Sequence, residues 1–123
     1  MPEQEKGYQY SSTKHGALIK PGGINIMRKT ELQTPAILVD LDILDQNIRK
    51  YQDLCNKYNK QLWPMIKTHK SSEIINMQVE AGATGFLCGT LDECEKLAEM
   101  GIQNIMYAYP VASEVNIKRV LAL

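Results

Sequence analysis

The sequence predicts an α/β fold in which about four βα units build a sheet of parallel strands. Short apolar runs of strand length alternate along the chain with stretches of helical period. Alternating strands and helices with short connections that contain glycine are typical of right-handed βαβ units. Ile66, Leu87 and Ala108 recur about every twenty residues, the compact repeat expected of a (β/α)8 TIM barrel.

Each element is predicted from its own residues. The first strand spans residues 36–39, and a helix from about Asp42 to Tyr58 follows it, with Asp42 as its cap. The later strands fall in residues 62–66, 84–89 and 105–109. Their helices begin at Ser71 or Ser72, at Thr90 with Glu93 at capping-box spacing, and at Ser113, and the first two end at Gly82 and Gly101.

The length of the chain predicts a partial barrel. A complete (β/α)8 barrel needs about 250 residues, whereas this chain has 123. We therefore expect residues 1–29 to be a flexible N-terminal extension and residues 30–123 to be the N-terminal part of an incomplete barrel domain. A small open doubly wound domain is the alternative. The extension has no apolar segment long enough for a secretory signal, and Met27 is a candidate initiator.

Composition narrows the classes of partner. The chain has 14 basic and 14 acidic residues, and this balance predicts neither nucleic acid nor an anionic membrane surface as a ligand. No apolar run approaches the roughly 20 residues of a membrane span. A small molecule or another subunit is the expected partner. The cysteines form no CxxC pair and are predicted to be reduced core residues of a cytoplasmic protein: Cys55, Cys88 and Cys94.

A basic cluster follows directly on a predicted strand in the stretch "LWPMIKTHKSSEI". Chemistry in parallel α/β folds gathers at the carboxyl ends of the strands, and Lys67 is the first polar residue after this strand. A lysine can form a Schiff base with an aldehyde cofactor when burial or nearby cations deprotonate it, and His69 and Lys70 are nearby in sequence. A solvated lysine at a strand end is the alternative.

Three stretches resemble, in order and spacing, the amino-terminal part of the D-threonine aldolase and D-serine dehydratase family: "TPAILVDLDILDQNIRK", "PMIKTHKSSEI" and "AGATGFLCGTLDECEKLAEMGIQNIMYAYP". These are fold-type III pyridoxal-phosphate enzymes with an alanine-racemase-like barrel. The resemblance covers roughly residues 31–123 and implies that Lys67 holds pyridoxal phosphate as a Schiff base. It also implies that His69 binds the cofactor, with a loop histidine bonded to backbone as the alternative.

The activity that this resemblance implies is that of a lyase on D-3-hydroxy amino acids, by aldol cleavage or dehydration. A small amino-acid substrate, a divalent metal and a homodimer are implied for the complete enzyme. The metal ligands of the family lie near its carboxyl terminus, so no residue of this chain is predicted to bind metal. We expect the isolated chain to be inactive. A racemase of the same fold and a non-catalytic half-barrel that binds a partner are the alternatives.

Overall fold

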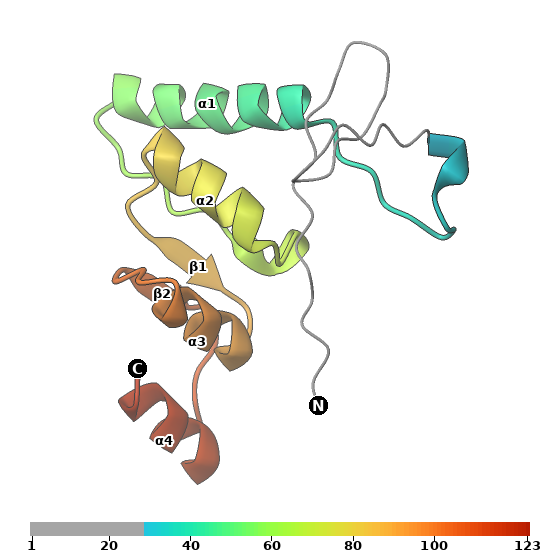
Figure 1. Ribbon diagram of the computed structural model, residues 1–123. Coiled ribbons are helices and arrows are strands. Elements are labelled where there is room, and N and C mark those ends of the chain that lie inside the picture. The colour runs from blue at the N-terminus through green and yellow to red at the C-terminus, as the bar shows by residue number, and fades with distance from the viewer. Residues whose placement is uncertain (1–28) are drawn as a thin grey trace. The chain divides into compact units, whose positions relative to one another are not determined.

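The computed structural model describes residues 29–123, and its helices and strands alternate from α2 to the last helix, α4 (Figure 1). The elements are η1 (Lys29–Glu31), α1 (Leu41–Lys57), η2 (Ile66–Thr68), α2 (Ser72–Ala81), β1 (Phe86–Cys88), α3 (Leu91–Glu99), β2 (Ile105–Tyr107) and α4 (Glu114–Leu121). Contacts divide the described residues into two compact units, with the division between Asn47 and Ile48. The predicted extension lies outside the described residues except for Lys29. No helix within residues 29–123 has both the length and the apolar character needed to cross a membrane.

In the first unit, the prediction of a strand at residues 36–39 is wrong. This segment forms no strand, and Ile37 is 95% exposed. A strand exists only where its amides and carbonyls pair with a neighbouring strand, and no described residue forms a ladder with this segment. Apolar composition alone therefore did not decide the conformation here.

The cap of α1 is Asp40, and the prediction of Asp42 is wrong. Oδ1 of Asp40 accepts hydrogen bonds from the backbone amides of Asp42 and Ile43, both at 3.1 Å. These amides belong to the first turn and have no partner within the helix, so the residue just before the helix is the one that satisfies them. Asp42 lies inside the first turn, where its charge interacts favourably with the helix dipole.

The second unit contains the parallel strands that the sequence predicts. β1 and β2 pair in parallel register, Phe86 with Ile105, Leu87 with Met106 and Cys88 with Tyr107. The strand predicted at residues 62–66 is reduced to one parallel bridge between Met65 and Leu87. The carbonyl of Pro64 accepts from the amide of Leu87 at 2.9 Å, but proline has no N–H to return to a ladder. The strand is therefore short, and η2 begins directly after it.

The predicted caps of the three later helices are confirmed. The side chains of Ser71, Thr90 and Ser113 each accept a hydrogen bond from the backbone amide three residues further on. Gly82 and Gly101 follow α2 and α3 with φ values of 112° and 81°, a left-handed conformation that glycine adopts without steric penalty. These local signals place the helices that carry the site.

The core of the second unit forms around β1. Its buried members are Ile66, Ile75, Phe86, Cys88, Cys94 and Leu97. Cys88 and Cys94 are buried and form no disulfide, as predicted for core residues. Burial, together with the neighbouring Cys94, raises the pKa of Cys88 to about 12. The third cysteine, Cys55, is half-buried in α1.

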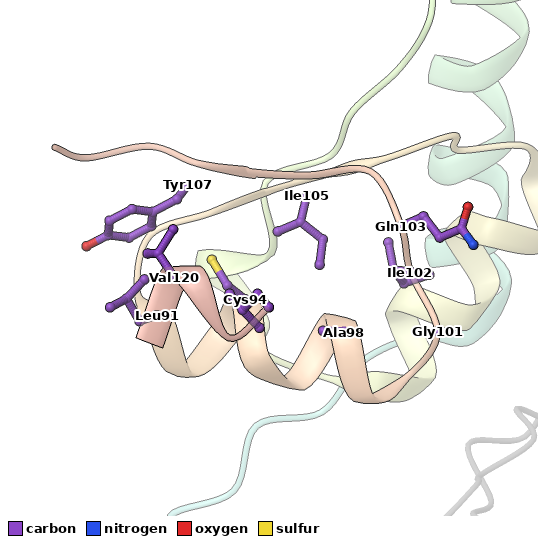
Figure 2. A pocket seen from close by; sticks show the side chains of 10 residues that line it. Leu91, Cys94, Ala98, Gly101, Ile102, Gln103, Ile105, Tyr107 and Val120 are labelled. Atoms are coloured by element: carbon purple, nitrogen blue, oxygen red, sulfur yellow. The ribbon is translucent and has the colours of Figure 1, made fainter. Parts of the chain in front are cut away.

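A cavity of about 590 Å³ lies between α3, β2 and α4. Figure 2 shows Leu91 and Cys94 of α3, Ile105 and Tyr107 of β2, and Val120 of α4 around it. Polar contacts also join α3 and α4.

Arg119 of α4 makes those polar contacts with α3. It donates from Nε and Nη2 to the two carboxylate oxygens of Glu95, each at 2.7 Å. This paired geometry is the strongest that a guanidinium and a carboxylate form. These charged contacts therefore join α4 to α3 beside the cavity.

Candidate active site

Lys67 lies at the carboxyl end of a parallel strand segment, where the sequence predicts it. Met65 forms the bridge to Leu87, and the next residue, Ile66, is 2% exposed and anchors the start of η2. Lys67 follows, and its side chain is exposed. No residue of the described chain forms a hydrogen bond or ion pair with its amine. The amine is thus accessible, while its backbone is fixed by the core.

Gly89 allows the stem of Lys67 to lie against the end of β1. A Cβ atom at residue 89 would stand 3.2 Å from Cδ and 3.5 Å from Cγ of Lys67. Carbon atoms pack best at about 3.5–4.0 Å, so a larger residue would press on the stem. The same Cβ position is 3.6 Å from Oε2 of Glu93. The lysine stem, the glycine and the carboxylate therefore meet at one place.

Glu93 is a buried carboxylate beside this meeting point. It is 6% exposed, and it accepts hydrogen bonds from the Gly89 amide at 2.7 Å and from Nζ of Lys70 at 2.5 Å. Burial alone would raise the pKa of Glu93, but the hydrogen bonds from Lys70 and Gly89 outweigh it and hold the pKa below its ordinary value. Glu93 is therefore ionised at neutral pH.

The loop from η2 to α2 brings Lys70 to this carboxylate. The carbonyl of Ile66 accepts from the amides of both His69, at 3.2 Å, and Lys70, at 2.9 Å. Lys70 has a φ of 48°, in the left-handed region that residues with a Cβ rarely occupy. The ion pair with Glu93 offsets the strain of this conformation. Glu93 thus connects the turn that contains Lys67 to the end of β1.

His69 is half-buried in the same loop. Its Nδ1 accepts from the backbone amide of Ser71 at 3.2 Å, while Nε2 is buried and has no partner among the described residues. Burial lowers the pKa of His69, and attraction by Glu93 opposes this only in part. The ring is therefore neutral at neutral pH, and the hydrogen bond at Nδ1 assigns its proton to Nε2. The hydrogen bond to backbone that the loop alternative requires is present. The buried Nε2–H of His69, however, has no acceptor among the described residues.

The structure brings together Lys67 and His69, both predicted from the sequence, and adds Glu93. Sequence reasoning predicted Glu93 only as a capping-box residue of α3, and the ion pair with Lys70 joins residues 23 positions apart. A signal was present: an acidic residue in the first turn after β1, next to a strand that ends in a basic cluster. No group of three or more His, Cys, Asp or Glu side chains within residues 29–123 could hold a metal ion.

Parallel strands joined by helices, with a lysine at their carboxyl end, define a protein of the α/β class. The family model described as "Alanine racemase, N-terminal domain" matches residues 39–122, and the chain belongs to this family. The predicted fold, a partial barrel of the alanine racemase type, is thereby confirmed.

Similar proteins come from the families that the sequence motifs indicate. The D-threo-3-hydroxyaspartate dehydratase of Delftia sp. (strain HT23) is 37% identical over 81 residues, which cover 66% of this chain and 21% of that protein. The 3-hydroxy-D-aspartate aldolase of Paracoccus denitrificans (strain Pd 1222) is 32% identical over 98 residues, covering 79% and 25%. The structure of D-threonine aldolase from Filomicrobium marinum matches with a TM-score of 0.73 at 28% identity, covering 76% and 25%. The chain thus spans at most a quarter of these relatives, and the predicted resemblance is confirmed.

Proposed function

We propose that this chain supplies the cofactor lysine of a pyridoxal-phosphate-dependent lyase that acts on D-3-hydroxy amino acids. The observation that carries the proposal is the exposed amine of Lys67, which has no partner among residues 29–123 and follows the parallel bridge of Met65, in a chain of the alanine racemase family. The relatives are named for D-threo-3-hydroxyaspartate, 3-hydroxy-D-aspartate and D-threonine. All three are D-amino acids with a hydroxyl on the third carbon, which defines the proposed substrate class.

The residues around Lys67 fit such a cofactor. Its amine is free to hold an aldehyde, and Gly89 leaves room for the stem that presents this amine. His69 offers a buried Nε2–H that no described residue accepts, and buried donors in folded proteins almost always have a partner. We assign His69 as a donor to an acceptor atom of the cofactor and Lys67 as the residue that holds its aldehyde.

Pyridoxal phosphate, when bound, supplies an electron sink for the electrons freed when a bond at the substrate's Cα breaks. Lys67 would hold the cofactor at rest, and its free Nζ would accept or return the proton at Cα during turnover. His69 would hold the cofactor through Nε2 alone, because the Ser71 amide occupies Nδ1. Since His69 is neutral, it adds no positive charge beside Lys67.

The remaining partners follow from the same proposal. A small amino acid is the ligand, in agreement with the balanced charge of the chain. A divalent metal, a homodimer and a cytoplasmic location stay predictions for the natively expressed protein. So does the division into an extension at residues 1–29 and a barrel domain from residue 30.

Trapping of the cofactor tests the assignment of Lys67. The natively expressed protein is incubated with pyridoxal phosphate, reduced with borohydride and mapped by peptide mass spectrometry. We expect the label on Lys67, its loss in Lys67→Ala, and full retention in the matched control Lys60→Ala, which removes another exposed lysine. A label that persists at its original level in Lys67→Ala would remove Lys67 from this role.

Product analysis tests the reaction class. Purified natively expressed protein is supplied with D-threo-3-hydroxyaspartate and with D-threonine. Dehydration releases a 2-oxo acid and ammonia, whereas aldol cleavage releases glycine and an aldehyde, and either result supports a lyase. Interconversion of the D and L enantiomers without these products would identify the racemase alternative and overturn the proposed reaction.

A further inference from the structure

Two lysines compete for the same aldehyde in the turn after the bridged strand. Lys67 and Lys70 are three residues apart, and both side chains are exposed, that of Lys70 by 58%. Solvent access therefore does not distinguish them. Their amines differ in pairing: Lys70 donates to the buried carboxylate of Glu93 at 2.5 Å, whereas no described residue pairs with Lys67.

Pairing with a carboxylate decides which lysine reacts, because condensation with an aldehyde needs a neutral amine. The lone pair of the lysine nitrogen attacks the aldehyde carbon, a C=N bond replaces the C=O bond, and the carbonyl oxygen leaves as water with the two protons that the nitrogen loses. Lys70 forms an ion pair with Glu93 at 2.5 Å, and an ammonium in an ion pair has no lone pair to give. Lys70 must leave its ion pair before it can react.

We propose that Glu93 selects Lys67 over Lys70 as the lysine that condenses with the cofactor. This inference rests on the proposed function and adds a residue to the site. Glu93 acts through Lys70, which it holds as an ammonium, and through the Gly89 amide, which it fixes beneath the stem of Lys67. It is therefore a positioning residue and not a catalytic one.

The burial of Glu93 makes this selection effective. An ion pair between two exposed side chains is weak because water and salt screen it. The Glu93 side chain is only 7% exposed, so breaking its contact with Lys70 would leave a buried charge with one partner fewer. The Gly89 amide, at 2.7 Å, also keeps the carboxylate from rotating away.

Trapping with borohydride tests the selection by mapping the label on both lysines. In the wild-type protein we expect at least about a tenfold excess of label on Lys67 over Lys70, in line with the strength of a hydrogen bond between charged groups. In Glu93→Gln, which keeps the shape and an acceptor for the Gly89 amide, we expect most of this excess to disappear as Lys70 becomes labelled. Glu99→Gln is the matched control, because it removes an exposed carboxylate from the same helix, and it should retain the excess.

The outcomes separate the inference from the proposed function. Label on neither lysine of the wild-type protein would overturn the proposed function itself. Label on Lys67 with the same excess in Glu93→Gln would overturn the role of Glu93 alone.

A second measurement needs no variant. Trace acetylation of the wild-type protein should modify Lys70 about tenfold more slowly than the exposed Lys60. Equal rates would overturn the inference even if Glu93→Gln does not fold.

Discussion

Replacement of Gly89 with alanine would push the stem of Lys67 away from the end of β1. The new Cβ would lie 3.2 Å from Cδ of Lys67. Because carbon atoms pack best at about 3.5–4.0 Å, the stem must move by roughly half an ångström. The amine lies two bonds beyond Cδ, and a misplacement of about 1 Å at a reacting group can reduce its effectiveness about 10²-fold. We expect trapping of pyridoxal phosphate at Lys67 to slow by about ten- to a hundredfold.

The stability of Gly89→Ala should change little, so the loss would not reflect unfolding. Gly82 and Gly101 are the glycines with positive φ in residues 29–123, and Gly89 is not among them. Alanine therefore fits the backbone, and the less flexible unfolded chain favours folding by about 0.4–1 kcal/mol. The flexible lysine stem can move aside at small cost. Urea unfolding measures the stability, and the rate of borohydride trapping measures the site.

Gly101→Ala is the control with the opposite expectation. No atom lies within 4 Å of a Cβ at this residue, but its φ of 81° is strained for alanine, by about 1–2 kcal/mol. The control should lose stability and retain trapping at Lys67. A folded Gly89→Ala protein that traps the cofactor at the wild-type rate would refute the contact between Gly89 and the lysine stem.

Three further changes test the fold and the loop around the site. Gly85→Ala should lower the free energy of unfolding in urea by about 1–3 kcal/mol. The new Cβ would stand 2.7 Å from Trp63 and 2.8 Å from the carbonyl of Asn104, and an unchanged urea midpoint would contradict this packing. Ser71→Ala should lower it by about 1 kcal/mol through loss of the cap of α2, and Ser71→Thr should restore most of that. His69 has a folded pKa below its ordinary 6.5, so the unfolded chain binds more protons, and its contribution to stability is present above about pH 6.5 and lost on acidification. The free energy of unfolding in urea should therefore fall less steeply from about pH 7 to pH 5 in His69→Gln than in the wild-type protein. An identical slope in the two proteins would contradict the burial of the neutral ring.

The starts of α2, α3 and α4 and the ends of α2 and α3 were predictable because their signals are local. Ser71, Thr90 and Ser113 cap helices within three residues of themselves, and Gly82 and Gly101 end them through their own φ angles. A cap depends on neighbours in sequence, which a single chain displays directly.

Features that depend on distant residues were harder to predict. Residues 36–39 have the composition of a strand but no partner ladder in the described chain. The position of Lys67 followed from a general rule about parallel strands, and the structure agrees with it. The partnership of Glu93 with Lys70 was missed, because a left-handed φ at a lysine has no signature in composition or period.

The buried thiols of Cys88 in β1 and Cys94 in α3 can report how often the core opens. Alkylating reagents attack the thiolate, and Cys88, with no exposed surface and a pKa of about 12, offers almost none while the core is closed. Its alkylation rate therefore follows the frequency with which β1 and α3 separate. Cys55, half-buried in α1, serves as the internal reference for the reagent itself. The rate at which the core around β1 opens can thus be measured by mass spectrometry of the alkylated cysteines, without any introduced label.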